Sequence, residues 1–464
     1  MDNIAFASVE QLHTMFAAGA TSPLELLEAQ FARIDRFNDR INAFTLLCRD
    51  AAWSAARASD ARWRAGRPLG RLDGITFSVK DNYQVRGLPF RRGSLATDDA
   101  PAADSSPWVQ RMQDAGAVLV GLTTMPEFGA GAVTISPLTG TTRNPWDVRL
   151  HAGGSSGGAA AAVAAGFCTT ALASDAGGSV RIPSALTGTV GFKPTGGRIP
   201  MHPTSFVGPI SSVGAIARCV DDVVHTLAPA VAPDPRDPFA AGDGSDWLHA
   251  QVDPSRLRVA WSVDMGYAPK VDEEVAACVR QAAHRFAELG CVVEQAHPDV
   301  RSPLDVFATI TRASYRHTFK GFSAEARARL GPVLRGMLEE SAEVSLEQYL
   351  DAQDQAQAWA TTLGEFHRTY DLLILPTVAA PAFDASLPVP PAFSGLANPR
   401  AWSPFTSLFN LTRQPALSMP AGLTASGLPV GMQLVGAQFN DGVVLAAAKA
   451  WERLAGLAAA PALH

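Results

Sequence analysis

Three short segments contain the residue types that serine-based hydrolysis requires. Ser78–Asn82 has the sequence Ser-Val-Lys-Asp-Asn and places a lysine at the end of an apolar run. Gly153–Gly158 reads Gly-Gly-Ser-Ser-Gly-Gly, and Asp175–Pro183 reads Asp-Ala-Gly-Gly-Ser-Val-Arg-Ile-Pro. A buried amine, nearby hydroxyl groups and a glycine-rich backbone are the parts of a base, a nucleophile and an oxyanion hole.

Lys80 ends an alternating, β-branched run that predicts a buried strand over residues 72–80. Burial disfavours the ammonium form and lowers the pKa of a lysine. A neutral amine is a usable general base near pH 7. Two simpler alternatives are that Lys80 extends its ammonium group to solvent or that it pairs with Asp81.

Ser179 follows two glycines, so the backbone N–H groups around it can converge on one point. An oxyanion hole needs this convergence, and each such donor contributes about 3–4 kcal/mol of transition-state stabilisation. The same tripeptide also occurs in ordinary turns. The chemistry predicted for Ser179 therefore depends on what lies beside it.

The second segment contains a G-x-S-x-G spacing that would make Ser156 the nucleophile of an α/β-hydrolase. That motif requires a strand directly before it, and we predict turn and irregular chain for residues 144–151. It also requires a late histidine, for which the candidates are His367 and His464. No lysine follows these glycines, as a phosphate-binding loop would require. We therefore favour neither the nucleophile elbow nor the phosphate-binding loop.

Helices and strands alternate around these segments. Capping patterns at Ser8 and Ser22 predict two N-terminal helices. Residues 378–403 are rich in Pro and Ala and predict an ordered surface loop or lid. Other runs predict strands over 118–120, 370–377 and 432–435, and helices over 159–165, 265–370 and 441–456. The alternation predicts an α/β protein with a sheet wrapped by helices.

Residues 128–211 are rich in Gly, Ser, Thr and Pro, a composition that is typical of flexible linkers. They also contain the helical block Ala159–Ala165, which Gly166 can end, and the apolar stretch Phe167–Ala173. Linkers rarely contain such elements. We therefore predict that this region is an ordered part of the fold.

The composition is that of a globular enzyme. Hydrophobic residues make up 47% of the 464 residues and charged residues 18%, which permits a large core. The net charge of −6 and the scattered basic residues give no reason to expect nucleic acid or an anionic membrane as partner. We see no signal peptide and no apolar stretch of spanning length. The five cysteines form no C-x-x-C pair, so we expect reduced thiols and a cytoplasmic location.

Taken together, the three segments resemble the amidase signature family. The intervals from Lys80 to Ser155 and from Ser155 to Ser179 match the usual spacing of that family. The resemblance spans about residues 5 to 456. Further matches lie at residues 68–74, 126–128, 144–146, 191–195, 370–377, 420–422 and 427–431. The resemblance implies a mixed, twisted central β-sheet surrounded by helices. It also implies a single domain over residues 1–464, with a signature core at about 70–220 and a helical insert at about 265–370.

The resemblance also implies a role for each reactive residue. Ser179 is expected to be the nucleophile, and Ser155 to relay a proton between Ser179 and neutral Lys80. The Gly154–Ser155 peptide bond is expected to be cis, and no metal or organic cofactor is expected. The implied oxyanion-hole donors are the backbone N–H groups of Ala176, Gly177, Gly178 and Ser179, and the implied acyl-pocket loop is Phe128, Gly129, Ala130 and Gly131. Arg181 is expected to pair with a buried carboxylate, and Ser156 to bond locally or to Lys80.

The implied function is an amidase that acts on small or medium-sized, fairly apolar carboxylic amides, with anilides, esters or carbamates as further substrates. The alternative is the glutamine-hydrolysing A subunit of a tRNA-dependent amidotransferase. That subunit carries an arginine about fourteen residues before the Tyr-Asp pair, where this chain has Ala356, and residues 351–367 contain no arginine. A catalytically silent binding protein is disfavoured because all three triad positions are filled. The expected partner is a small-molecule amide, and a homodimer would be ordinary.

Two departures from the family pattern stand out. Ala176 occupies a position where many members have Thr or Ile, which alters packing but leaves the backbone donors. Arg413-Gln414 replaces the Gly-Leu or Gly-Ile that commonly follows Asn410-Leu411-Thr412.

Overall fold

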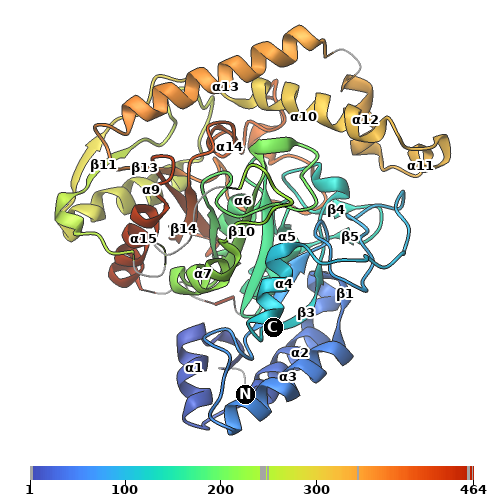
Figure 1. Ribbon diagram of the computed structural model, residues 1–464. Helices are drawn as coiled ribbons and strands as arrows, with labels where there is room; N and C mark the ends of the chain where they lie inside the picture. The colour runs from blue at the N-terminus through green and yellow to red at the C-terminus, as the bar shows by residue number, and fades with distance from the viewer. Residues whose placement is uncertain are drawn as a thin grey trace.

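The computed structural model describes residues 4–240, 247, 250–341, 344–456, 460–461 and 463. A mixed sheet of eleven strands runs through the centre of the molecule, and helices surround it (Figure 1). This architecture confirms the predicted α/β fold. In spatial order the strands are β1 (Phe44–Leu47), β3 (Val118–Thr123), β2 (Thr76–Lys80), β8 (Thr170–Asp175), β10 (Ser212–Ala217), β9 (Val190–Lys193), β14 (Ala416–Leu423), β15 (Pro429–Gly436), β13 (Leu372–Pro376), β11 (Arg258–Trp261) and β12 (Val292–Gln295).

The central sheet contains both parallel and antiparallel pairs of strands. Strand β2 runs parallel to both β3 and β8, and β11 runs parallel to both β12 and β13. The other neighbours are antiparallel. Two small sheets lie outside the central one, formed by β4 (Ile135–Ser136) with β5 (Gly140–Thr141) and by β6 (Arg143–Asn144) with β7 (Asp147–His151).

The helices fall into groups along the chain. In Figure 1 the N-terminal helices lie at the opposite end of the molecule from α10 to α13. None of the helices within the described ranges is both long and apolar enough to cross a membrane. Their bounds are α1 (Val9–Ala17), α2 (Pro23–Ile41), α3 (Arg49–Arg64), α4 (Pro107–Asp114), α5 (Gly157–Ala164), α6 (Arg181–Thr187), α7 (Val220–Leu227), α9 (Glu273–Arg285), α10 (Leu304–Phe319), α11 (Ala324–Ala328), α12 (Pro332–Glu340), α13 (Leu346–Phe366), α14 (Leu408–Leu411) and α15 (Asp441–Ala455).

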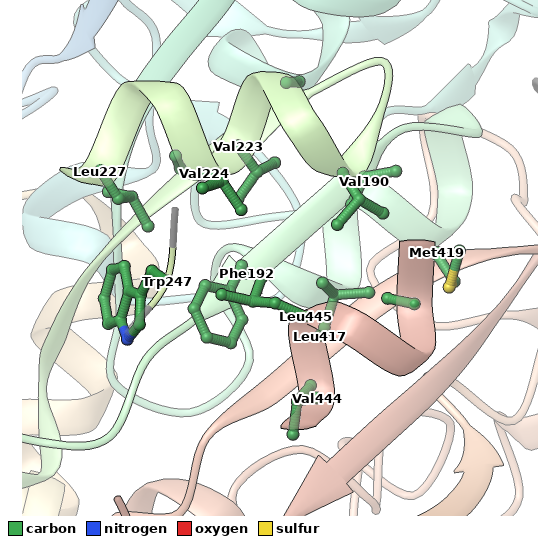
Figure 2. Packing of buried hydrophobic residues seen from close by; sticks show 14 of the residues in the cluster. Val190, Phe192, Val223, Val224, Leu227, Trp247, Leu417, Met419, Val444 and Leu445 are labelled. Carbon is green, nitrogen blue, oxygen red and sulfur yellow. The ribbon is translucent and has the colours of Figure 1, made fainter. Parts of the chain in front are cut away.

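Figure 2 shows part of the largest hydrophobic core, where α7 and α15 pack against strands β9 and β14. Each of the side chains named here has at most 2% of its surface exposed, and burying one contributes about 1.5–3 kcal/mol. The labelled members are Val190, Phe192, Val223, Val224, Leu227, Trp247, Leu417, Met419, Val444 and Leu445. This packing supports β9 and β14 in the middle of the sheet, where β10 lies between β9 and β8.

Many local predictions are confirmed. Ser8 and Gln11 form a capping box, and Ser22 caps α2 with Pro23 in its first turn. Gly166 follows α5 with a φ of +68°, in the left-handed region that favours glycine. The linker alternative for residues 128–211 is wrong, because this region contains α5, α6 and strands of the central sheet.

Two predictions of secondary structure are wrong. Residues 147–151, expected to be irregular, form β7, because β6 pairs with them and Leu150 bridges to Asp384 in a distant loop. The helical stretch predicted over 265–370 is interrupted by β12, which pairs with β11 at the edge of the sheet. An edge strand has one unpaired side and half-exposed side chains, so its alternation is weak.

Several central strands, β8, β10, β9 and β14, were not predicted as strands, and β14 has a sequence feature that argues against one. Strand β14 contains Pro420, a residue that cannot donate to a ladder and that argues against a central strand. The register with β15 shifts between Pro420 and Gly422, so the proline lies at an irregularity of the ladder. This bulge is the reason why β14 can occupy the interior of the sheet.

Candidate active site

The parallel pair β2 and β8 brings the first and third segments together. Their register pairs Val79 with Leu172, so both strands end at the same edge of the sheet. Lys80 ends β2, and Ser174 and Asp175 end β8. The carboxyl ends of neighbouring parallel strands are a common place for functional side chains, because the loops that follow them converge there.

Lys80 lies at this edge and has no exposed surface. Its Nζ is 2.7 Å from Ser155 Oγ and 3.1 Å from Ser174 Oγ. Burial lowers the pKa of Lys80 to about 7, against the opposing attraction of Asp175. The solvent-exposed alternative is therefore wrong. The Asp81 alternative is also wrong, because the Asp81 carboxylate accepts hydrogen bonds from the N–H groups of Gly93 and Arg91.

Ser155 lies just before α5, and its side chain is almost fully buried. The Gly154–Ser155 peptide bond is cis, as the family resemblance implies. A Cβ on Gly154 would lie 2.8 Å from the carbonyl carbon of Val133, so the loop before α5 passes close to another backbone. Ser155 is thus held between Lys80 and the cavity described below.

Ser179 lies in the turn between β8 and α6, and its side chain is partly exposed. Gly178 has a φ of +117°, which favours glycine, and a Cβ there would collide with Thr406. Thr406 Oγ1 donates to the carbonyl of Gly177 at 2.8 Å. These contacts define the course of the backbone that presents Ser179.

The backbone N–H of Ser156 donates to the carbonyl of Ser179 at 3.1 Å, which joins the second and third segments. Both Ser155 and Ser179 line the same cavity as Lys80. Among the described residues no hydrogen bond joins the hydroxyls of Ser155 and Ser179. Catalytic hydrogen bonds are often long in enzymes without substrate and tighten when it binds.

The four predicted oxyanion-hole donors differ in their contacts. Gly178 N–H donates to Asp175 Oδ1 at 2.7 Å, so this hydrogen is already engaged. The N–H groups of Ala176, Gly177 and Ser179 make no hydrogen bond within the described part of the chain. Three of the four donors are therefore available to a substrate oxygen.

Arg181 pairs with a buried carboxylate, as predicted. Its Nε lies 2.9 Å from Asp175 Oδ2, and neither side chain is exposed. Burial by itself would raise the pKa of Asp175, but the Arg181 guanidinium holds it well below its usual range. Asp175 also accepts hydrogen bonds from the N–H groups of Gly178 and Val180 and from the Asn410 side chain. This network fixes both ends of the turn that carries Ser179.

Ser174 and Asn82 belong to the site although the sequence analysis did not assign them roles. Asn82 Nδ2 donates at 2.9 Å to Ser174 Oγ, the same hydroxyl oxygen that lies 3.1 Å from Lys80 Nζ. Ser174 directly precedes the third segment and Asn82 ends the first. Their positions next to Asp175 and Lys80 on converging strand ends were the available signal.

Ser156 does not have the surroundings of a nucleophile elbow. Its Oγ is fully buried and donates to the carbonyl of Ser174 at 3.3 Å, a local bond of the kind that was predicted. His367 Nδ1 lies 2.9 Å from the carbonyl of Tyr370, and His464 lies outside the described residues. No histidine of the described residues lines the cavity that holds Ser155 and Ser179.

The cavity has a volume of about 1120 Å³ and reaches from the triad residues to α10 and α12. The predicted acyl-pocket loop, Phe128 to Gly131, forms part of its wall. A Cβ on Gly129 would lie 3.6 Å from Ser155 Oγ, so this loop is directly beside the triad. Tyr315 of α10 donates to the carbonyl of Phe128 at 3.1 Å and holds the loop in place. Apolar walls come from Phe128, Phe206, Phe307, Leu334 and Trp402.

Comparison with known proteins shows the family of this chain. Residues 25–445 match the family model named Amidase. The chain is 34% identical to an acylamidase of Rhodococcus erythropolis, over 97% of this chain and 96% of that one. It is 33% identical to the A subunit of the glutamyl-tRNA(Gln) amidotransferase of Anaeromyxobacter dehalogenans (strain 2CP-C), over 96% and 95% of the two chains.

Solved structures give the same result. A bacterial aryl acylamidase of the amidase signature family superimposes with a TM-score of 0.89 at 29% identity, over 97% of this chain and 96% of that one. The 6-aminohexanoate cyclic dimer hydrolase complexed with substrate has a TM-score of 0.89 at 29% identity, over 99% of both chains. The chain therefore belongs to the amidase signature family of amide-hydrolysing enzymes.

Proposed function

We propose that this protein hydrolyses carboxylic amides through an acyl-enzyme on Ser179, with Ser155 as the proton relay and Lys80 as the base. The observation that carries the proposal is the 2.7 Å contact between Ser155 Oγ and the buried amine of Lys80. Burial lowers the pKa of that amine to about 7, so a substantial fraction is neutral at physiological pH. A neutral amine can accept a proton, which a lysine with an ordinary pKa cannot do at this pH.

The reaction starts when Ser179 Oγ turns toward Ser155 and attacks the carbonyl carbon of the amide. The Ser179 proton passes to Ser155, and the Ser155 proton passes to Lys80. The N–H groups of Ala176, Gly177 and Ser179 stabilise the negative charge that develops on the carbonyl oxygen. When the intermediate collapses, the leaving nitrogen takes a proton from Lys80 through Ser155, and the amine departs.

Water then attacks the acyl-enzyme along the same route in reverse. Ser155 and Lys80 accept the proton of the water, and the carboxylic acid is released as Ser179 recovers its hydrogen. No step needs a group from outside the chain, apart from substrate and water. We therefore propose that no metal or organic cofactor takes part.

The cavity favours small or medium-sized amides with apolar parts, because most of its named walls are aromatic or aliphatic. Anilides are included in the proposal, since the relatives include an acylamidase and an aryl acylamidase. The proposal also includes esters and carbamates, because they present a similar electrophilic carbonyl carbon to Ser179.

The alternative is a glutamine-hydrolysing A subunit, which the 33% identity to such a protein supports. Against it, Ala356 on α13 is buried in a hydrophobic cluster and offers no charge to a glutamine carboxylate. Purified chain alone should release amine from simple anilides. Glutamine hydrolysis that appears only with a tRNA-binding partner would identify the amidotransferase component instead.

The nucleophile is tested by substitution of Ser179 and its neighbours. Ser179→Ala should lower kcat for an anilide by about 10⁴-fold or more, because it removes the atom that forms the acyl-enzyme. Lys80→Ala and Ser155→Ala should also be severely impaired. Ser156→Ala is the matched comparison, and it should retain far more activity than these variants.

A serine-directed fluorophosphonate, followed by peptide mass mapping, locates the reactive serine independently of turnover. The label should lie on Ser179. A label on Ser156, together with near-normal turnover of Ser179→Ala, would refute the assignment.

A further inference from the structure

The active-site cavity contains a guanidinium that the described residues leave without an ion-pair partner. Arg400 lines the cavity together with Ser179, on the loop between β13 and α14. Its Nε is buried and makes no hydrogen bond in the described part of the chain. No described carboxylate lies within ion-pair distance of Arg400, and burial lowers the pKa of its guanidinium. The charge of Asp175 attracts it from further away, but that carboxylate is already paired with Arg181.

Arg400 is close to the reacting centre. Its guanidinium carbon lies 5.3 Å from the centre of the Phe307 ring. That ring packs on the turn before the nucleophile, since a Cβ on Gly177 would collide with Phe307. The same aromatic ring therefore contacts both the guanidinium and the turn of the predicted oxyanion hole.

The backbone around Arg400 is well held. Its N–H donates to Asn398 Oδ1 at 2.9 Å, and its carbonyl accepts from Ser403 N–H at 2.9 Å. Trp402, two residues on, is 2% exposed, and its carbonyl accepts from Ala379 N–H at 2.8 Å. The loop therefore presents this guanidinium from a fixed position, which reduces the entropy lost when a ligand binds.

Arg400 as a residue is only partly buried, but its Nε is buried without a hydrogen bond. Stacking on Phe307 offers the guanidinium no hydrogen-bond acceptor, so its N–H donors stay unpaired in the described part of the chain. Unpaired donors are tolerated most readily where a ligand supplies the missing acceptor. The unpaired guanidinium of Arg400 therefore indicates that it takes part in ligand binding.

Most other charged groups of the cavity already have partners. Arg312 pairs with Glu340. Glu127 accepts hydrogen bonds from Ser94 Oγ at 2.6 Å and from Gly331 N–H at 2.8 Å.

Arg92 is the informative comparison. Its guanidinium carbon lies 4.3 Å from the centre of the Phe90 ring and 5.7 Å from that of Phe128, and the charge of Asp81 attracts it. Arg92 therefore contacts two aromatic rings, whereas Arg400 contacts one ring and has a buried Nε without a hydrogen bond in the described part of the chain.

We propose that Arg400 binds a carboxylate of the substrate, so that the substrates are amides with an apolar body and one free carboxylate. A guanidinium presents a planar fork of donors that fits a carboxylate with two parallel hydrogen bonds. A neutral amide leaves this fork unpaired. The inference rests on the proposed hydrolysis at Ser179 and narrows its substrate class.

The test compares amides of similar size with and without a carboxylate. One pair places the carboxylate on the acyl side: adipic acid monoanilide against heptananilide. The other places it on the amine side: N-hexanoyl-4-aminobenzoate against N-hexanoyl-4-toluidine. For at least one pair, kcat/KM of wild-type protein should favour the acid by tenfold or more, and the pair that shows this identifies the side.

Arg400→Met should reduce that preference to less than threefold, and Arg400→Lys should give an intermediate value, because lysine keeps the charge without the fork. The matched variants Arg92→Met and Arg312→Met should change the preference by less than threefold. Circular dichroism and Tm confirm folding of each variant.

Equal kcat/KM values for both members of both pairs in the wild-type protein would overturn the carboxylate assignment. A preference that survives in Arg400→Met, or that is lost in Arg92→Met instead, would also overturn it. Neither result affects the proposed hydrolysis, which fails only if Ser179→Ala retains turnover of the neutral anilide.

Discussion

At the scale of single residues, the site depends on the cost of burying Lys80. The amine has no contact with solvent, and its two hydrogen-bond neighbours are hydroxyl groups rather than a carboxylate. The attraction of Asp175 offsets only part of the desolvation. The base that we propose is therefore usable at neutral pH because its charged form is poorly stabilised.

This predicts the pH dependence of activity. Only neutral Lys80 accepts a proton, so kcat/KM for a neutral anilide should fall as pH decreases through about 7 and should level off above about 8. Initial rates between pH 5 and 9 measure this limb. A profile that stays flat down to pH 5 would exclude Lys80 as the base.

The same burial predicts an effect on stability. The pKa of Lys80 is lower in the folded than in the unfolded chain, so the unfolded chain binds more protons between pH 7 and about 10.5. The resulting penalty is largest below pH 7 and fades as pH rises toward 10.5. Lys80→Met should therefore raise the free energy of unfolding at pH 7 by an amount on the order of a few kcal/mol relative to wild type. This gain should be seen as a higher urea concentration at the unfolding midpoint.

The difference between Lys80→Met and wild type should shrink when the urea titration is repeated at pH 9.5. If Lys80→Met and wild type were equally stable at both pH values, burial of the Lys80 amine would have no free-energy cost. Such a result would remove the physical basis of its lowered pKa.

At the scale of elements, the turn from β8 to α6 is held by one buried ion pair. Asp175 ends the strand and Arg181 begins the helix, so the pair spans the segment that carries Ser179. The Arg181 guanidinium also donates to Asn410 of α14 and to Gln433 of β15. Elements far apart in the chain therefore meet at the base of this turn.

Asp175→Asn should lower the free energy of unfolding by about 3–5 kcal/mol, because it leaves the buried guanidinium of Arg181 without its counter-charge. Activity should fall as well, since the same carboxylate holds Gly178 N–H. Asp35→Asn is the matched control, since it breaks the exposed Asp35–Arg49 pair and should cost less than about 1 kcal/mol. Urea unfolding at pH 7 compares the three proteins, and similar losses in both variants would contradict the structural role of Asp175.

The elements themselves were predicted unevenly from sequence. Capped helices such as α2 and buried strands such as β3 carry their own signals, and both were predicted. Strands β7 and β12 were not, because partners elsewhere in the chain stabilise them more than their own pattern does. Strand β14 was hidden by its proline.

At the scale of the whole molecule, most cysteines lie in the buried interior. Four of the five are buried, in separate places, and Cys278 is partly exposed; all five are unpaired. Burial raises the pKa of the Cys48 and Cys168 thiols to about 11, which keeps them unreactive. A cytoplasmic location stays a prediction.

Ellman's reagent should therefore titrate about one thiol in native protein and all five in denaturant. Tm should be the same with and without a reductant. Fewer than five thiols in denatured, unreduced protein would reveal a disulfide that the fold does not contain.

The sequence by itself singled out the candidate reactive residues, because lysine, serine and glycine at these intervals are local facts of the chain. It also determined the helices and buried strands that have strong patterns of their own. Only the tertiary structure decided that Ser174 shares Lys80 with Ser155, that Asp175 takes the N–H of Gly178, and that Arg400 faces the cavity unpaired. The physical reason is that hydrophobic periodicity encodes neighbours along one element, whereas contacts such as Asn410 with Asp175 depend on the order of strands in the sheet.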